Sequence, residues 1–316
     1  MTGENGFSAR ISDIRVEAAG VKSFLLEAAD GTDLPAWTPG AHVDLALAPG
    51  MNRQYSLCGD GDDRQGLRFA VLREPQSRGG SAMLHEQVKP GDMMQVLAVR
   101  NNFPLVPAGH SLLVAGGIGI TPILAMVREL ERQGRDWRLL YGGRTRAGMA
   151  FIDDLAGYGD KVMVRPEDEF GLLDLAAFLG AAEPGKVAYC CGPEPLIKAV
   201  EAHCANWPEE SLRIERFRPM EQEPHGADTA FEVELKQSGK VVAVPPDKSI
   251  AVALEEVGVY IPRSCNEGTC GTCLTRVVEG LPDHRDSFLR PRQREKNALI
   301  LVCCSRSLTP RLVLDA

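Results

Sequence analysis

Cysteines near the end of the chain have the spacing of a metal-binding site. The stretch CNEGTCGTC, residues 265–273, arranges Cys265, Cys270 and Cys273 as C-x4-C-x2-C, and Cys303 follows after 29 further residues. Thiolate sulfur suits zinc, copper(I) and iron–sulfur clusters. A zinc ribbon needs two C-x2-C pairs, and this segment has one. A C-x4-C-x2-C group followed by one distant cysteine is instead the spacing of a [2Fe–2S] cluster.

The residues around these cysteines also suit such a cluster. Gly268 and Gly271 can adopt positive φ, which lets the loop wrap tightly and brings its amides toward the sulfurs. Cys304 is adjacent to Cys303, and neighbours on a strand point to opposite faces, so the two cannot readily ligate one ion together. Zinc, or reduced structural thiols, is the alternative use of these cysteines.

A first glycine-rich stretch, RGGS at residues 78–81, could hold a phosphate group. Arg78 offers a guanidinium fork, and Gly79 and Gly80 permit a close approach of the backbone. Ser81 would open a short helix whose free N–H groups favour an anion. A plain glycine turn, with Ser81 capping the helix, is the alternative interpretation.

A second glycine-rich stretch, LLVAGGIGITPILAMV at residues 112–127, places glycines between a buried strand and a helix. Gly116, Gly117 and Gly119 would let a dinucleotide approach the main chain, with its negative charge at a helix N-terminus. The spacing is not G-x-G-x-x-G, so the standard dinucleotide fingerprint does not apply. The stretch is also shorter than the ~20 apolar residues that a membrane span needs.

Composition and charge limit the class of protein. The chain has 44% hydrophobic and 25% charged residues, an ordinary globular composition. Its formal charge of −8 argues against a nucleic-acid binder, which needs a clustered basic surface. The start, MTGENGFSARIS, lacks the basic and apolar regions of a secretory signal. We therefore expect a cytoplasmic protein that binds no membrane and uses its cysteines for metal binding or catalysis.

The period of the apolar residues changes twice along the chain, which predicts three domains. Residues 1–105 contain short runs broken by proline–glycine turns, typical of an antiparallel β-barrel. Residues 106–222 alternate strand and helix patterns, which indicates an α/β domain with a parallel sheet. A polar linker at about 218–229 leads to the third domain, residues 223–316, which opens with a hairpin pattern turning at Ser238-Gly239.

The motifs resemble, in this order, those of the ferredoxin–NADP reductase superfamily. RQYS at 53–56 resembles its flavin-lining RxYS motif, and GGIGITP resembles its GGxGxTP motif. CGP at 191–193 and LRIERF at 212–217 resemble later segments of the same nucleotide domain. The final domain, with Cys303 before x-S-R, resembles a plant-type ferredoxin, which implies an α+β, β-grasp-like fold.

This resemblance implies a role for each motif. The flavin would contact Arg53, Tyr55, Ser56, Arg78, Gly79, Gly80 and Ser81, and FMN is favoured over FAD because no aromatic platform for an adenine is visible. The pyridine nucleotide would contact Gly116, Gly117, Gly119, Thr121, Cys191, Gly192 and Pro193. The catalytic residues would be Ser56, Cys191 and Phe217, the last covering the flavin. The iron ligands would be Cys265, Cys270, Cys273 and Cys303.

The order of the three domains resembles the phthalate dioxygenase reductase family. The resemblance implies an NADH-dependent flavin iron–sulfur oxidoreductase that passes electrons through FMN and a [2Fe–2S] cluster, singly, to a Rieske-type oxygenase component. The choice of NADH rests on the resemblance: Arg144 and Arg146 could grip a 2′-phosphate, and PEDEF at 166–170 would repel one only if it lies nearby. The alternatives are a stand-alone NAD(P)H diaphorase and an iron–sulfur redox sensor without turnover.

Overall fold

The computed structural model describes residues 6–76, 79–220 and 228–316. The chain divides into two compact units, Met1–Glu215 and Arg216–Ala316, and each unit has apolar clusters of its own. Most of the expected linker, residues 221–227, lies outside the described residues. No helix in the described ranges is long and apolar enough to cross a membrane.

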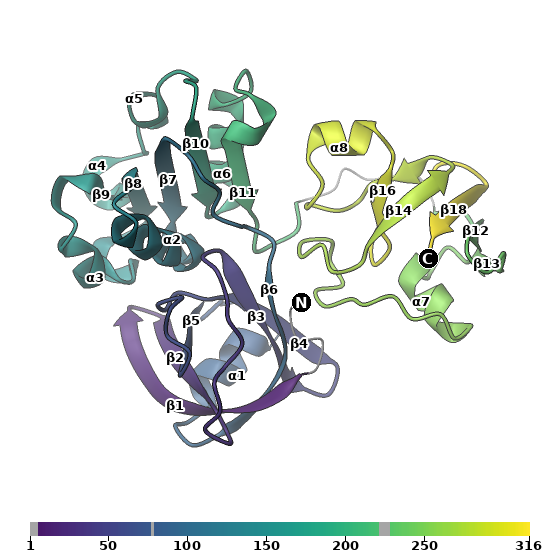
Figure 1. The fold of residues 1–316 in the computed structure, drawn as a ribbon, viewed down its shortest axis with the longest axis horizontal. Coiled ribbons are helices and arrows are strands. Elements are labelled where there is room, and N and C mark those ends of the chain that lie inside the picture. The colour runs from purple at the N-terminus through teal and green to yellow at the C-terminus, as the bar shows by residue number, and fades with distance from the viewer. Residues whose placement is uncertain (1–5, 77–78, 221–227) are drawn as a thin grey trace. The chain divides into compact units, whose positions relative to one another are not determined.

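The first unit opens with a six-stranded antiparallel sheet in the order β4-β3-β6-β1-β2-β5 (Figure 1). Its strands are β1 Phe7–Ala18, β2 Val21–Ala28, β3 Ala41–Ala48, β4 Met51–Ser56, β5 Leu67–Leu72 and β6 Met93–Asn101, with helix α1 Gly80–Glu86 after β5. The outermost strands approach each other where Leu57 bridges Phe69, so the sheet curls toward closure. Alternate apolar residues, among them Phe24 and Val43, fill its interior. The expected flavin-type β-barrel architecture is confirmed.

The same unit continues with a five-stranded parallel sheet in the order β11-β10-β7-β8-β9. Its strands are β7 His110–Gly116, β8 Asp136–Gly143, β9 Val162–Pro166, β10 Lys186–Cys191 and β11 Leu212–Glu215. Its α-helices are α2 Ile120–Arg132, α3 Ile152–Ala156, α4 Glu167–Phe170, α5 Leu175–Leu179 and α6 Glu194–His203. Side chains of α2 pack on one face of the sheet, and those of α5 and α6 pack on the other. The predicted α/β architecture is therefore confirmed.

The two sheets of the first unit share part of their core. Val21 and Ala70 of the antiparallel sheet belong to the same buried cluster as the apolar face of α2. Arg128 of α2 also donates to the carbonyl oxygen of Cys58, just beyond β4. The antiparallel and parallel sheets are consequently fixed against each other.

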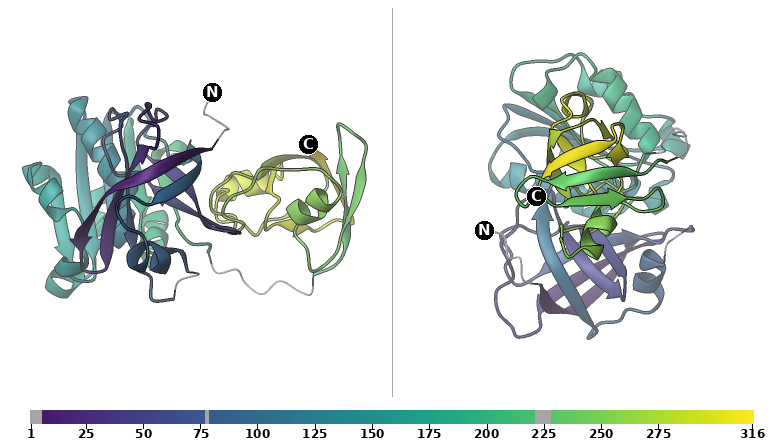
Figure 2. Two further views of the ribbon diagram at one scale, coloured as in Figure 1. Left: turned by 90° about the horizontal axis from the view of Figure 1, so that it is seen from below. Right: turned by 90° about the vertical axis from the view of Figure 1, so that its right-hand side faces the viewer.

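The second unit is an α+β domain with a five-stranded mixed sheet in the order β13-β12-β18-β14-β16. Its strands are β12 Phe231–Leu235, β13 Val241–Val244, β14 Leu274–Glu279, β16 Leu299–Leu301 and β18 Arg311–Asp315, and a small pair is formed by β15 Pro282–Asp283 and β17 Arg306–Ser307. Its helices are α7 Ile250–Glu256 and α8 Pro291–Glu295. Ser249 caps α7 by accepting from the amide of Val252, and the apolar face of α7 covers one face of the sheet (Figure 2). The predicted hairpin is present, and Gly239 has φ +67° at its turn.

Candidate functional site

Three side chains from different strand ends meet in the first unit. Ser56 ends β4, Cys191 ends β10 and Glu215 ends β11, where Cys191 and Glu215 are register partners. The hydroxyl of Ser56 donates to Oε2 of Glu215 at 3.4 Å, and the thiol of Cys191 reaches the same oxygen at 4.0 Å. The end of the antiparallel sheet therefore lies at the carboxyl edge of the parallel sheet, where α/β proteins bind their ligands.

Burial changes the acid–base chemistry of this group. Ser56 and Cys191 are buried, and Glu215 is partly buried. Loss of solvent raises the pKa of Glu215 to about 8, against a lowering contribution from the Ser56 hydrogen bond. Burial, with the neighbouring Glu215 second, raises the pKa of the Cys191 thiol well above its usual value. Both groups are consequently neutral at pH 7.

Sequence reasoning selected Ser56 and Cys191 but missed Glu215. The residue lies inside LRIERF, the segment from which only Phe217 was chosen. A carboxylate next to the end of an apolar strand is a signal, since a charged residue there needs a polar partner. That the partner is Ser56, 159 residues away, only the fold shows.

The RQYS strand and the glycines of RGGS lie against each other. A Cβ atom on Gly80 would come within 2.9 Å of Cγ and Nε of Arg53, and one on Gly79 would come within 3.1 Å of Met51. Gly79 also has φ +93°, which favours glycine. The two motifs are therefore adjacent, with the Arg53 side chain running along Gly80.

The remaining residues predicted at the flavin have defined surroundings where they are described. The ring of Tyr55 stacks on Phe69 with centroids 5.3 Å apart. The hydroxyl of Ser81 accepts from the backbone amide of Glu74 at 3.2 Å, and the N-terminal residue of α1 has no side-chain cap. Ser81 is therefore not the helix cap of the alternative interpretation. Arg78 lies outside the described residues.

The second glycine stretch packs directly on the CGP segment. A Cβ atom on Gly116 would meet Pro193 at 2.6 Å, and one on Gly119 would overlap the carbonyl of Cys191. A Cβ atom on Gly192 would likewise lie 3.0 Å from the Gly116 backbone. Because β7 and β10 are neighbours, these two motifs, far apart in sequence, form one edge of the parallel sheet. Glycine is required here for close contact between the two backbones.

Three further predicted residues have less direct support. Gly117 has φ +54°, and a Cβ atom there would meet nothing within 4 Å. Thr121 is buried, and its hydroxyl donates to the carbonyl of Ile118 at 3.0 Å. Phe217 is 42% exposed and belongs to the second compact unit. The roles predicted for them at the nucleotide and the flavin stay predictions.

In the second unit, the loop between α7 and β14 carries three of the predicted iron ligands. Cys270 and Cys273 are buried, and Cys265 is partly exposed. The sulfur of Cys265 accepts from the amide of Glu267 at 3.4 Å, and that of Cys270 accepts from the amide of Thr272 at 3.5 Å. Contact with Cys265, followed by burial, raises the pKa of Cys270. Amides directed at sulfurs are what a cluster-bound thiolate needs.

Two glycines shape this loop as the sequence predicts. Gly268 has φ +72° and Gly271 has φ +73°. A Cβ atom on Gly271 would overlap the ring of Phe288, and one on Gly268 would lie 2.5 Å from the sulfur of Cys304. The loop is therefore folded tightly against the segment 286–288 and against the cysteine pair.

The cysteine pair is not on a strand, which corrects the sequence-based argument that the two side chains point apart for that reason. The strand β16 ends at Leu301, and the chain turns because Cys304 and Ser305 both donate to the Leu301 carbonyl. Cys303 is buried in the same core cluster as Cys273, whereas Cys304 is less buried. Contact with Cys303, and then burial, raises the pKa of Cys304.

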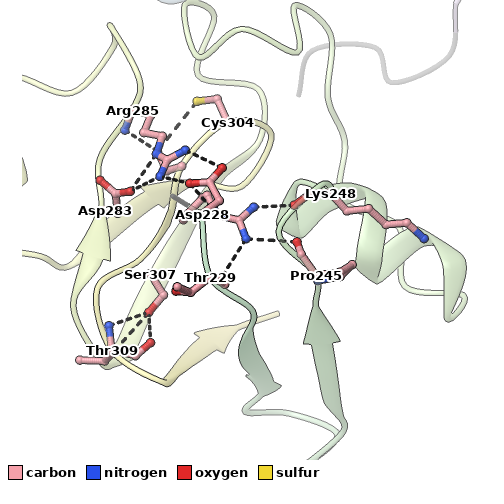
Figure 3. A network of polar contacts seen from close by, with 11 residues as sticks. Asp228, Thr229, Pro245, Lys248, Asp283, Arg285, Cys304, Ser307 and Thr309 are labelled. Atoms are coloured by element: carbon pink, nitrogen blue, oxygen red, sulfur yellow. Dashed lines mark hydrogen bonds and ion pairs between the residues drawn. The ribbon is translucent and has the colours of Figure 1, made fainter. Parts of the chain in front are cut away.

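The residues after the pair anchor it in the domain (Figure 3). Arg306 is buried and donates to the carbonyls of Lys248 at 2.8 Å and of Thr229 and Pro245 at 3.1 Å each. The hydroxyl of Ser305 accepts from the amide of Arg285 at 3.1 Å. The x-S-R motif that follows Cys303 is therefore a structural anchor for the turn.

A second anchor is DHRD, residues 283–286, to which the sequence assigned no role. The guanidinium of Arg285 forms a bidentate pair with Asp228 at 2.6 and 3.2 Å and also bonds Asp283 at 2.8 Å (Figure 3). The side chain of Asp286 accepts from the amides of Phe288 and Leu289. The amide of Ser287 donates to the carbonyl of Gly268 in the cysteine loop. DHRD thus fixes the loop that carries the predicted ligands.

These thiols fit a [2Fe–2S] cluster, which divides four cysteines over two irons. The amides at Cys265 and Cys270 and the buried Cys273 and Cys303 are consistent with such a cluster.

Comparisons with known proteins agree with this geometry. Residues 233–308 match the model of the 2Fe-2S iron-sulfur cluster binding domain. The chain is 41% identical over 310 residues to the phenoxybenzoate dioxygenase subunit beta of Ectopseudomonas oleovorans, covering 98% of this chain and 97% of that one. The solved structure of phthalate dioxygenase reductase superposes with a TM-score of 0.72 at 35% identity, covering 98% of each chain. An intact type IV self-sufficient cytochrome P450 monooxygenase gives a TM-score of 0.89 at 37% identity, over 98% of this chain and 41% of that one.

Proposed function

Because this chain belongs to the phthalate dioxygenase reductase family, we propose that it takes electrons from NADH through FMN and a [2Fe–2S] cluster and passes them singly to a Rieske-type oxygenase component. The match extends over almost the whole length of the phenoxybenzoate dioxygenase subunit and of phthalate dioxygenase reductase. This supports the complete electron-transfer function rather than one step of it. When bound, FMN supplies the conversion of a hydride pair into single electrons, and the cluster supplies one-electron transfer. The cytoplasm is the compartment we infer for it.

We assign the flavin to the antiparallel sheet of residues 1–105. Arg53 and the glycines beside it would hold the phosphate together with Arg78 and Ser81, and Tyr55 would lie against the ring. Ser56 would then face the reacting edge, next to Cys191. The buried hydroxyl and thiol exclude water there, and the neutral Glu215 adds a hydrogen bond without adding a charge.

The nucleotide belongs, in this proposal, to residues 106–222 and the cluster to residues 223–316. Gly116, Gly117 and Gly119, with Thr121 and the CGP segment, would bind the pyridine nucleotide at the carboxyl edge of the parallel sheet. Cys265, Cys270, Cys273 and Cys303 would ligate the two irons, and Phe217 would cover the flavin. Cys304 would remain a thiol.

The observation that carries the proposal is the contact of Ser56 with Glu215 beside Cys191. It brings the predicted hydride acceptor end of one sheet to the predicted hydride donor end of the other. If the two sheets bound their ligands far apart, no hydride could pass from the nucleotide to the flavin.

Anaerobic titration of the holoprotein tests the proposal. NADH is expected to bleach a mixed flavin and iron–sulfur spectrum, to give an electron-spin signal of a reduced [2Fe–2S] cluster, and to support reduction of cytochrome c. Colourless, zinc-loaded protein would overturn the proposal in favour of a structural site. A flavin that NADH reduces but that never reduces the cluster or an oxygenase component would indicate the diaphorase, and a cluster that responds without turnover would indicate the sensor.

A further inference from the structure

Two charged segments lie side by side at the carboxyl edge of the parallel sheet. Gly143, the last residue of β8, pairs with Pro166, the last residue of β9, so the segments after these strands begin as neighbours. The segment after β8 carries Arg144 and Arg146, and the short helix α4 after β9 carries three acidic residues, Glu167, Asp168 and Glu169. This edge is where nucleotides bind in open α/β sheets.

Direct contacts join these segments. The guanidinium of Arg146 forms a two-point ion pair with Glu169, with Nε to Oε1 at 3.0 Å and Nη2 to Oε2 at 2.9 Å. The backbone amide of Asp168 donates to the carbonyl of Arg144 at 3.2 Å. The condition that the sequence left open, that PEDEF lies near the arginines, is therefore met.

The ion pair occupies the planar fork with which an arginine would otherwise bind a phosphate. Both partners keep their charges at neutral pH, because the pair lowers the pKa of Glu169 and raises that of Arg146. Both are about half exposed, so their attraction adds little to the stability of the fold.

Two further arginines lie at this edge. The guanidinium of Arg144 is exposed and has no hydrogen-bond or ion-pair partner within the described ranges. Arg165, in β9, is held over the ring of Phe170 at 4.8 Å and donates to the carbonyl of Val164. The three arginines of this edge equal the three carboxylates in number, so the discrimination must come from which charge lies nearest the ribose rather than from net charge.

From this arrangement we propose that Glu169, paired with Arg146, makes the protein select NADH over NADPH. The proposal rests on the proposed function, because it assumes that a pyridine nucleotide binds at this edge. The 2′-hydroxyl of NADH can donate to a carboxylate, as acidic residues accept it in other dinucleotide sites. The 2′-phosphate of NADPH would instead meet a carboxylate of like charge and an arginine already engaged.

The variant Glu169→Gln removes one negative charge and weakens the ion pair with Arg146, while the side chain keeps almost the same shape. Its kcat/KM for NADPH, measured by ferricyanide reduction, is expected to rise roughly tenfold relative to that for NADH, mainly through KM. Binding of adenosine 2′,5′-bisphosphate, measured by calorimetry, should tighten in parallel while binding of ADP does not. The double variant Glu169→Gln with Arg146→Ala should lose the gain.

Glu210→Gln is the matched control, since it removes the same charge from an exposed glutamate that also pairs with an arginine, Arg213 at 2.9 Å, elsewhere in this domain. If Glu169→Gln and Glu210→Gln had the same ratio of kcat/KM for NADPH to kcat/KM for NADH, the inference would be overturned. A gain that survives Arg146→Ala would equally overturn the role of the pair. If neither NADH nor NADPH reduced the flavin of the unaltered protein, the proposed function itself would fail, which is a different outcome.

Discussion

At the scale of single residues, Glu215 shows how position changes the chemistry of a side chain. Its carboxyl lies between the hydroxyl of Ser56 and the thiol of Cys191, and desolvation raises its pKa to about 8. A carboxyl that is neutral at pH 7 can donate a hydrogen bond, which a carboxylate cannot. The junction of the two sheets therefore holds three neutral polar groups rather than an anion.

This raised pKa predicts how stability depends on pH. Between the ordinary pKa of a glutamate, 4.5, and about 8, the folded chain keeps a proton on Glu215 that the unfolded chain releases. The contribution is thus fully present below 4.5 and is lost as pH rises to about 8, by at most ~1.4 kcal/mol per pH unit. Denaturant unfolding of Glu215→Gln, measured from about pH 5 to about pH 9, should show a flatter dependence of stability on pH than the unaltered chain.

The control for this experiment is Glu210→Gln, because the side chain of Glu210 is 76% exposed. It is expected to reproduce the pH dependence of the unaltered chain. Identical curves for Glu215→Gln and the unaltered chain would show that Glu215 is already ionised in the folded state at neutral pH.

The adjacent cysteines give a second prediction at this scale. Cys303 is buried with Cys273 in one core cluster, whereas Cys304 only packs against that cluster and its sulfur lies beside Gly268. Cys303→Ser is expected to remove the cluster and abolish cytochrome c reduction, while Cys304→Ser keeps most of both. Iron content and cytochrome c reduction measure this, and reduction of the flavin by NADH should survive in either variant. The opposite pattern would move the fourth ligand to Cys304.

At the scale of elements, the turn from β7 into α2 depends on contact with the CGP segment. Gly119 has an ordinary helical φ of −62°, so alanine is permitted by its backbone. A Cβ atom there would nevertheless overlap the Cys191 carbonyl, which is backbone and cannot rotate away. Gly119→Ala is expected to cost about 1–3 kcal/mol of stability and to raise the KM for NADH, as measured by thermal unfolding and steady-state kinetics.

Gly157 provides the comparison for that change. It follows α3 in the same domain with φ −64°, and a Cβ atom there would meet nothing within 4 Å. Gly157→Ala should therefore leave both the stability and the KM nearly unchanged. Equal effects of the two alanines would contradict the steric argument.

At the scale of the whole molecule, the two compact units have separate cores. The buried cluster of the mixed sheet contains only residues of the second unit, and those of the first two sheets contain only residues of the first. A chain ending at residue 220 is therefore expected to fold, bind FMN and reduce ferricyanide with NADH, but not to reduce cytochrome c. Absorption spectra and the two assays test this. Loss of flavin binding in that chain would show that the second unit is needed for the first site.

The sequence by itself determined the order of the domains' architectures, the strand and helix periods, and the ligand spacing of the cysteines. These are local properties, because a period of two or 3.6 and the reach of a short loop need only neighbouring residues. For the same reason the positive φ of Gly268 and Gly271 could be expected from their places in the loop.

Only the tertiary structure decided which distant residues meet. Glu215 reaches Ser56 across 159 positions, the three carbonyls that Arg306 binds come from segments 58 to 77 positions away, and Glu169 reaches Arg146 because β8 and β9 end at the same edge. No local pattern contains such pairings, since they depend on strand order and register. The chemistry of Glu215 and the engagement of Arg146 follow from those contacts, and neither could be predicted from the residue types alone.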